Sequence, residues 1–451
     1  MPEKLVIQPL NRGTNPVRLE LWVESGKVVK AKAGTTYYWD FSKILRGKDP
    51  LDALQLTQRS GSSDFISHSV AAARALEELA QKQIPENAHL SRSILTAFEM
   101  IYGHITHFYQ NVLPDYVPFP EHGPFSAGAG DFRVPAGNGD IVVRNVWRAF
   151  DIRRSIHQVM ALIGGKAPNI CAVVCGGVTY TPDVLTLVKI NSVLGEIAAF
   201  VNNEFTHDLE QVEKAYPEYF ITGAGLGTFI SVGEFTQKKN RDFLLSAGVG
   251  NITGNMTLDM SALSIDCTGS KFEPAGGEGA SWAGDFNPSP GKPGGYSWVK
   301  GVVYKDKPLE TGALARMCLS GRTEVTGLGN RAVSVLGRLR ARLEESKILL
   351  KYTEEWLGQL NPGNFPAEQV TLPDDGEAFG MAESPQGAVI HYTSIKDGKI
   401  SRYLVLDASA WNLCPGTRGG QNGPLEQALI GLNVRSGVVP IDILRTARSF
   451  I

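Results

Sequence analysis

The sequence predicts an α+β fold that is mainly helical and carries small β-sheets at its periphery. Apolar residues recur at helical spacing through much of residues 71–203 and 330–357. Alternation of apolar and polar residues, which is typical of strands, occurs near each end of the chain. With 451 residues, 43% of them hydrophobic, the chain can bury a large core. It contains no internal repeat or low-complexity linker, so we expect one intertwined domain.

The domain expected over residues 1–451 has four consecutive parts. They are N-terminal strands in 1–48, a helical core in 49–215, an irregular region of short strands and loops in 216–328, and a helix, hairpin and C-terminal segment in 329–451. In the first part, VRLELWVESGKVVKAKA alternates apolar and polar residues around Ser25 and Gly26. A serine–glycine pair between two alternating runs predicts a β-hairpin with one buried face.

Helices are expected through the second part. The segment AAARALEEL, residues 71–79, is rich in alanine and leucine. The helix expected over 91–112 has an apolar stripe and ends before Pro114. A third covers 145–163, and a fourth covers 181–203, where Thr181-Pro182-Asp183 supplies a cap and a first-turn proline.

The rest of the chain alternates between irregular and regular segments. Residues 221–310 are rich in glycine and turns, and GGEGASWAGDFNPSPGKPGG is expected as an irregular surface loop. A charged helix is expected over 330–357, with its run of Arg338, Arg340 and Arg342 on a solvated face. The stretch AVIHYTSIKDGKISRYLVL predicts a second hairpin that turns at Asp397-Gly398.

The net charge and the cysteines limit the classes of protein to which this chain can belong. The net charge of −2 argues against a general nucleic-acid or membrane-surface binder. No apolar run reaches the roughly 18 residues of a membrane span, and the first residues lack the apolar core of a signal peptide. A cytoplasmic location is therefore expected, unless a partner carries the chain elsewhere. The five cysteines are scattered, and Cys171 and Cys175, in NICAVVCGGV, are expected to be buried, inert thiols.

Seven stretches in one order resemble the large subunit of nickel–iron hydrogenases. They are IQPLNRGTNPVRLELWVESGKVV, GKDPLDALQLTQRSGSSDFISHS, HITHFYQNVLPD, ALIGGKAPNICAVVCGGVT, YKDKPLETGALARM, ESPQGAVIHYTSIKDGKI and WNLCPGTRGGQNGPLEQALIG. The resemblance runs nearly end to end, and it implies that family's helical core and pairing with an iron–sulfur small subunit.

The resemblance also implies two C-x-x-C pairs that would hold nickel and iron through soft thiolate ligands. Here the first pair falls on Gly61 and Asp64, and the second on Pro440 and Ile443. We refer to these four as the former ligand positions. The family's terminal histidine falls on Thr446. Glycine, proline and isoleucine cannot ligate a metal, and one aspartate offers only hard oxygen. The sequence therefore predicts no metal site and no cofactor in this chain, with iron–sulfur clusters in a partner subunit.

Other positions that the family uses for chemistry are also changed. The proton-passing glutamate corresponds to Thr14, the arginine above the metals to Gln386, a second-site carboxylate to Ser42, and the histidine facing the partner's cluster to Asn169. No catalytic residue is therefore assigned. A residual pocket is expected instead, lined by Arg59, Asp64, His68, Asp115 and Gln386.

Several of the remaining polar residues have a structural interpretation. His68 is expected to act as a hydrogen-bonded residue at the start of a helix. His104, His107 and Asp115 are expected to form a polar network beside the former site. Arg316 and Glu426 lie in apolar blocks, so they are expected to be paired and to tie core segments together.

Three functions remain open at this stage. The favoured one is a non-catalytic structural partner of an iron–sulfur small subunit in an electron-transfer complex, which would bind through the N-terminal loops, residues 164–178 and the helix ends around the former site. The second is a repurposed pocket that binds a small molecule or quinone. The third is a scaffold for hydrogenase maturation, which would need accessible thiols.

Overall fold

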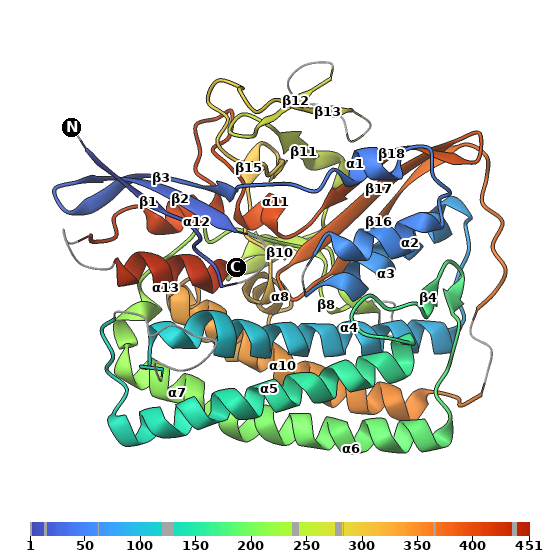
Figure 1. Cartoon of the computed structure of the whole chain (residues 1–451), viewed down its shortest axis with the longest axis horizontal. Coiled ribbons are helices and arrows are strands. Elements are labelled where there is room, and N and C mark those ends of the chain that lie inside the picture. The colour runs from blue at the N-terminus through green and yellow to red at the C-terminus, as the bar shows by residue number, and fades with distance from the viewer. Residues whose placement is uncertain are drawn as a thin grey trace.

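Long helices form one layer of the molecule. Helices α4 (Glu86–Thr106), α5 (Ala136–Gly164), α6 (Val184–Phe200) and α10 (Val335–Gln359) lie side by side (Figure 1). Their apolar faces build the largest core. The computed structural model describes residues 2–12, 16–61, 63–119, 130–236, 243–275, 282, 284–363, 367–434 and 440–451.

A three-stranded antiparallel sheet covers one side of this layer. Its strands are β16 (Gly376–Glu383), β17 (Ala388–Lys396) and β18 (Lys399–Leu406), with β17 in the middle. Helix α3 (Phe65–Leu79) lies directly on the sheet. A Cβ atom added at Gly380 would lie 1.9 Å from the Ala71 carbonyl oxygen, so only glycine permits this approach.

A second core lies under the N-terminal sheet. Strands β1 (Glu3–Ile7), β2 (Val17–Glu24) and β3 (Lys27–Thr35) pair antiparallel, as the hairpin prediction required. The Glu426 Oε1 atom accepts hydrogen bonds from the Ala33 amide at 2.9 Å and the Tyr296 hydroxyl at 2.6 Å. Glu426 therefore ties three segments together, as expected.

Short elements connect these layers. They are α1 (Phe41–Leu45), α2 (Asp52–Leu56), β4 (Val173–Val174), β5 (Gly177–Val178), α7 (Thr206–Ala215), β6 (Phe229–Ser231), β7 (Glu234–Thr236), β8 (Phe243–Leu245), β9 (Gly248–Asn251), β10 (Gly254–Met256), β11 (Leu263–Asp266), β12 (Phe272–Pro274), β13 (Phe286–Pro288), β14 (Gly301–Tyr304), β15 (Lys307–Pro308), α8 (Ala313–Leu319), α9 (Thr323–Thr326), α11 (Ser409–Asn412), α12 (Pro424–Leu429) and α13 (Ile441–Phe450).

The structure corrects three expectations about these elements. Strand β16 and helix α13 were not predicted. The signal for α13 was present, since Ile443, Ala447 and Phe450 recur at helical spacing and are all buried, whereas GEAFGMAE in β16 shows no clear alternation of apolar and polar residues. Helix α5 begins at Ala136, before the expected start. The arginine run of α10 is not a solvated face. Arg338 and Arg342 are buried, and Arg338 forms a double hydrogen bond with the Glu310 carboxylate.

One helical stretch meets the length and composition of a membrane span, which we had not expected. It covers Val184–Ala215, has a mean hydropathy of 1.7, and is 33% buried. Lys189 and Glu196 lie within it. A helix with one apolar face against the core passes the same test, so this is weak evidence for a span.

A buried ion-pair network joins the helix layer to the sheet. Arg316, in α8, is fully buried and donates to both oxygens of Glu345 at 2.7 Å. It also donates to the Glu383 carboxylate at 2.7 Å and the Ser384 carbonyl at 3.0 Å. The expected pairing of Arg316 is therefore confirmed.

Removing Arg316 should destabilise the fold strongly, because it leaves two buried carboxylates without their counter-charge. We expect Arg316→Met to lower the free energy of unfolding by about 3–5 kcal/mol, as measured by urea denaturation. Arg340→Met is the matched control. Arg340 is partly exposed in its pair with Glu213, so its loss should cost about 1 kcal/mol or less. Equal losses in the two variants would contradict this account.

Candidate functional site

A cavity of about 270 Å³ lies where the start of α3, the end of α4 and the loop after β18 meet. We call it the inner cavity. Its wall includes Gly61, Asp64, Gln386, Asp407 and Asn412. Three of these, Gly61, Asp64 and Gln386, are residues that the sequence placed at the former site. The fold therefore brings the first pair of former ligand positions and Gln386 to one cavity.

The two residues of that first pair are in direct contact. A Cβ atom built on Gly61 would lie 1.5 Å from Oδ1 of Asp64. The Asp64 carboxylate thus fills the space that a side chain at position 61 would need. With Asp64 in this conformation, any side chain at position 61 would collide with its carboxylate.

Asp64 faces the cavity because another carboxylate caps α3. Glu99, in α4, accepts hydrogen bonds from the Ile66 amide at 2.5 Å and the Ser67 amide at 2.9 Å, and also from the Ser67 hydroxyl. Asp64 occupies the N-cap position without a capping hydrogen bond of its own. Burial raises the pKa of Glu99 to about 8, although the hydrogen bonds from Ser67 and Ile66 favour the charged form and act to lower it.

His68 is fully buried and begins a chain of hydrogen bonds into the core. Its Nδ1 atom lies 3.0 Å from Nε2 of His391, and Nδ1 of His391 lies 2.9 Å from the Tyr403 hydroxyl. Burial, together with His68, lowers the pKa of His391 well below its usual value. On its other side, Nε2 of His68 lies 3.7 Å from the Asp64 carboxylate. The geometry fits the expectation that His68 is a hydrogen-bonded residue at the start of a helix. Its Nε2 atom faces Asp64, which lines the inner cavity.

The remaining predicted pocket residues lie elsewhere. Arg59 is exposed and donates to the Gln55 carbonyl. Asp115 is buried and accepts hydrogen bonds from Arg448 at 2.6 and 2.7 Å and from Arg12 at 2.8 Å. Neither lines the inner cavity, because each is held by its own neighbours.

The expected polar network of His104, His107 and Asp115 forms only in part, because His107 and Asp115 both bond to Arg448 whereas His104 pairs with Glu345. His104 lies 2.7 Å from the Glu345 carboxylate, and His107 lies 2.8 Å from the Arg448 carbonyl oxygen. Burial lowers the pKa of His104 to about 4 and that of His107 well below its usual value. Only His107 lines the inner cavity.

The second pair of former ligand positions does not face the cavity. Pro440 is the residue before α13, and Ile443 is fully buried in the second core. Thr446 is also fully buried, with its side chain against Gly223. The end of α13, Phe450 and Ile451, reaches the cavity instead.

Other substituted family positions have ordinary surroundings. Ser42 lies in α1 and Asn169 in the loop between α5 and β4, and both are partly buried. Thr14 lies outside the described residues. The expectation of buried cysteines at 171 and 175 is wrong, since Cys171 is exposed and Cys175 is half-buried. This removes our objection to a maturation role, although burial raises the pKa of Cys175 to about 12 and so keeps that thiol protonated.

Asp407 is the residue that sequence reasoning missed. It follows β18 directly, in LVLDASAW, and accepts a hydrogen bond from the Ser409 amide at 2.9 Å. Burial and the charge of Asp64 raise its pKa, and His68 opposes that rise. An acid directly after an apolar strand was the available signal. The sequence could not show that Asp407 belongs to this site, because its neighbour there, Asp64, is remote in the chain.

The sequence profile of the nickel-dependent hydrogenase family matches residues 40–122 and 120–451. The chain is 31% identical to the periplasmic [NiFeSe] hydrogenase large subunit of Desulfomicrobium baculatum, over 99% of this chain and 93% of that protein. It is 26% identical to the hydrogenase-2 large chain of Escherichia coli K12, over 100% and 96% of the two chains.

Solved structures agree with these relatives. A [NiFeSe]-hydrogenase structure from Dm. baculatum superposes with a TM-score of 0.94 at 32% identity, covering 100% of this chain and 98% of that chain. A Ni-Fe-Se hydrogenase structure from D. vulgaris Hildenborough has the same TM-score at 31% identity and the same coverage. The expected fold class, a mainly helical core with small sheets, is therefore confirmed.

The prediction that this chain has no cofactor is contradicted by these comparisons. The relatives that it matches along nearly their whole length carry nickel, iron and selenium in their names. A metal group therefore belongs to proteins of this fold and length, and the prediction is withdrawn.

The side chains around the inner cavity do not fit a group held by four thiolates. No described lining residue is a cysteine, and Gly61 has no side chain with which to bind a metal. Asp64 and Asp407 present oxygen atoms, which are hard ligands. Within the described residues, no three histidine, cysteine, aspartate or glutamate side chains are arranged to hold a metal ion. The wall instead presents oxygen and nitrogen acceptors.

A double-mutant cycle should reveal the contact between Gly61 and Asp64. Gly61→Ala should displace the Asp64 carboxylate and lower the free energy of unfolding, whereas Gly61→Ala in an Asp64→Ala background should cost less. We expect a coupling of roughly 0.5–3 kcal/mol, measured by chemical denaturation. Additive losses would show that position 61 tolerates a side chain beside Asp64.

Glu99 should make stability depend on pH. Because its folded pKa of about 8 lies above the ordinary 4.5, its contribution is fully present below pH 4.5 and is lost as pH rises through 8. We therefore expect the free energy of unfolding to fall over this window. Glu99→Gln should flatten that part of the profile, and an unchanged slope in the variant would contradict the assignment.

Proposed function

Because this chain belongs to the nickel-dependent hydrogenase family as a large subunit, we propose that it pairs with an iron–sulfur small subunit and serves as its structural partner in an electron-transfer complex. In this proposal the chain does not itself oxidise hydrogen. The relatives' names describe hydrogenase large chains, which supports the kind of partner. A larger complex that contains this pair is part of the proposal.

One observation carries the non-catalytic part of the proposal. The Asp64 carboxylate occupies the space that a side chain at position 61 would need. The first pair of former ligand positions is therefore a packed contact between a carboxylate and a glycine. Glu99 supports this contact by taking the α3 capping donors. A site that had merely lost one ligand would leave the space open; here a different side chain fills it.

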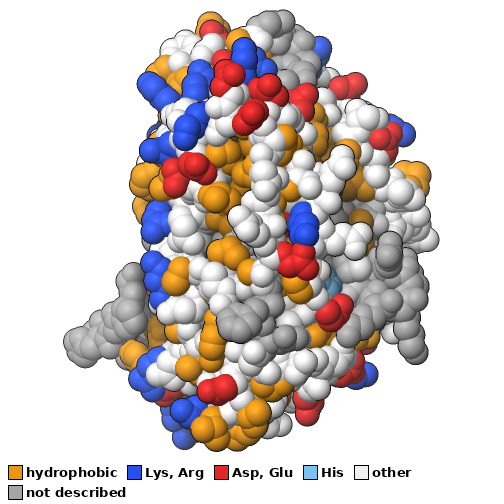
Figure 2. Space-filling model, turned by 90° about the vertical axis from the view of Figure 1, so that its right-hand side faces the viewer, with side chains coloured by type: hydrophobic (Ala, Val, Ile, Leu, Met, Phe, Trp, Pro, Cys, Tyr) orange, Lys and Arg blue, Asp and Glu red, His pale blue; other side chains and the backbone are white. Residues whose placement is uncertain are grey.

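The proposed partner face is the end of the molecule where α5 finishes and α6 begins. Figure 2 views this end and shows hydrophobic side chains spread over it, with Lys and Arg side chains gathered along one edge. Large apolar side chains are exposed there, namely Leu162, Tyr180, Val184, Leu185 and Val188. Val184, Leu185 and Val188 are 62%, 74% and 62% exposed. Several large apolar side chains exposed at one end of the molecule support a protein interface there.

The location of the complex is part of the same proposal. We place the complex in the cytoplasm, whereas the Dm. baculatum relative is named as periplasmic. Fractionation of cells that express the chain with its small subunit distinguishes these two placements.

Co-expression with the cognate small subunit should yield a one-to-one complex that lacks hydrogen oxidation activity. We expect Leu185→Asp to weaken the complex by about tenfold or more, because it places a charge in an apolar contact. Size-exclusion chromatography with light scattering measures the association, and dye reduction under hydrogen measures activity.

Val29→Asp is the matched control. Val29 lies in β3, away from this end of the molecule, and is 47% exposed. It should leave the complex intact. Hydrogen oxidation by the purified complex, together with nickel and iron measured at one each per chain, would refute the non-catalytic proposal. A monomer indifferent to the small subunit would refute the pairing.

A further inference from the structure

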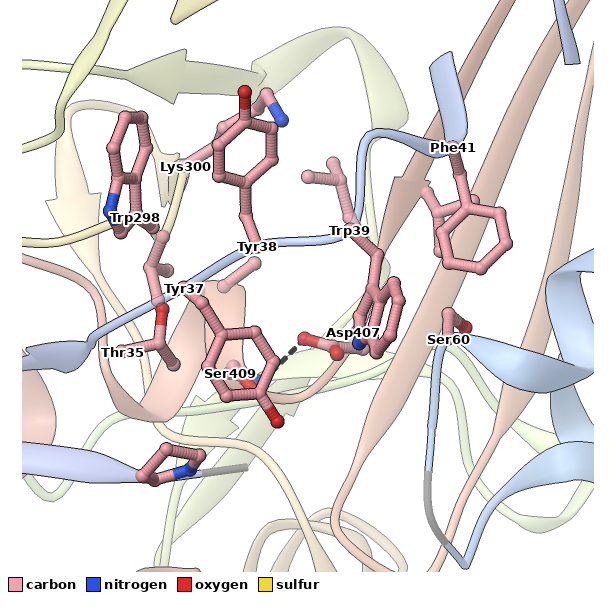
Figure 3. Close-up of a pocket in the computed structure, with 15 residues that line it drawn as sticks. Thr35, Tyr37, Tyr38, Trp39, Phe41, Ser60, Trp298, Lys300, Asp407 and Ser409 are labelled. Atoms are coloured by element: carbon pink, nitrogen blue, oxygen red, sulfur yellow. Dashed lines mark hydrogen bonds between the residues drawn. The ribbon is translucent and has the colours of Figure 1, made fainter. Parts of the chain in front are cut away.

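Two cavities meet at Asp407. The inner cavity adjoins an outer one of about 120 Å³, which is lined by Tyr37, Trp39 and Trp298 among other residues (Figure 3). Both cavities are lined by Thr35, Asp407 and Ser409. The two cavities therefore lie next to each other, with Asp407 in the wall of both.

Among its described lining residues, the inner cavity has two aspartates, Asp64 and Asp407, and one arginine. Asp64 is 7% exposed, and its capping role is taken by Glu99. The charge of Asp64 raises the pKa of Asp407, which indicates that the two carboxylates are close enough to repel. The arginine is Arg153, whose guanidinium donates to the neutral Gln110 side chain at 3.0 Å and the neutral Tyr102 hydroxyl at 2.9 Å, so the two carboxylates outnumber this one cation.

Two unpartnered polar atoms add an independent observation. His68 is 0% exposed, and its Nε2 atom, directed at Asp64, has no hydrogen-bond partner within the described part of the chain. Oε1 of Gln386 is likewise buried and unpartnered there, while its amide nitrogen donates to Ser63 at 3.0 Å. Buried polar atoms nearly always have partners. Carboxylate and amide oxygens only accept hydrogen bonds, so they call for a ligand that donates them.

The outer cavity has the surface that attracts such a ligand. Tyr37 and Trp39 are 37% and 57% exposed, and their rings are nearly perpendicular with centroids 6.1 Å apart. Aromatic faces attract organic cations. Lys300 lines the same cavity, with its ammonium 3.8 Å from the Phe272 ring centroid and pointing away from Asp407 in Figure 3. Burial lowers the pKa of Lys300 to about 8, and Asp407 is among the charges that oppose this shift. The aromatic mouth and the acidic floor therefore favour the same charge.

We propose that the joined cavities bind a small organic cation, with a guanidinium or ammonium head between Asp64 and Asp407 and the rest of the molecule toward Tyr37 and Trp39. The head would donate hydrogen bonds to the two carboxylates and to Gln386, which are stronger because they are charge-assisted. A bare metal ion fits less well, because within the described residues no three His, Cys, Asp or Glu side chains are arranged to hold one. This inference does not depend on the small-subunit pairing.

Agmatine, which has a guanidinium at one end and an ammonium at the other, is the probe. Isothermal titration calorimetry with the full chain should show saturable binding at millimolar or lower concentration. Asp64→Asn and Asp407→Asn should each weaken it by about tenfold or more, since each removes a charged acceptor. Trp39→Leu changes an exposed side chain and should weaken binding a few-fold while leaving the fold intact.

The controls separate this site from general charge attraction. Asp151→Asn removes an exposed carboxylate of α5 whose partner is Arg154, and it should bind agmatine as the wild type does. The neutral analogue 1,4-butanediol should not bind. Absence of saturable agmatine binding, or binding unchanged in both Asn variants, would overturn the proposal. Competition by Mg²⁺ with the same dependence on Asp64 and Asp407 would replace the organic cation with an inorganic one. The same titration on the small-subunit complex tests whether the site stays accessible, and its result is independent of whether hydrogen is oxidised.

Discussion

Arg316 ties together helix α8, helix α10 and the end of strand β16, next to the turn that carries Gln386 to the cavity wall. Its guanidinium, fully buried in α8, bonds to Glu345 of α10 and to Glu383 at the end of β16. It also bonds to the carbonyl of Ser384, in the turn that carries Gln386 to the cavity wall. Arg342, one helical turn before Ser346 on α10, donates to the Pro385 carbonyl at 3.0 Å in the same turn. Because these charges are buried, each depends on all of its partners.

The chemistry of the inner cavity depends on where the fold places the carboxylates of Asp64 and Asp407. Glu99 caps α3, so the Asp64 carboxylate is left to face Gly61, His68 and the cavity. Asp407 approaches from the opposite segment, after β18. Two acids from segments far apart in the chain thus line one small space, where burial first and the charge of Asp64 second raise the pKa of Asp407. A wall of this kind selects for positive, hydrogen-bond-donating ligands.

Family membership and local chemistry give different information about this protein. The match in fold and length places the chain among hydrogenase large subunits, whose names include metals. The residues at the same cavity are hard acceptors with a glycine where a ligand side chain would be needed. Fold is set by hundreds of packing contacts and survives such changes, whereas a metal site depends on a few side chains. Function therefore has to be argued from the site.

The sequence by itself determined the elements whose pattern is local. The alternation around Ser25-Gly26 specified the β2–β3 hairpin, because the signal lies within a few residues. The Thr181-Pro182-Asp183 run placed the start of α6 to within three residues, although the cap is Asp183 and Pro182 lies before the helix rather than in its first turn. The sequence also placed Gly61, Asp64 and Gln386 near one site through the family resemblance. Only the tertiary structure decided that Arg338 and Arg342 are buried, that Cys171 is exposed, and that Ile443 packs into a core rather than the cavity. It alone brought Asp407 to Asp64. Burial and pairing between residues remote in the chain depend on which surfaces meet in three dimensions, and no local pattern records that.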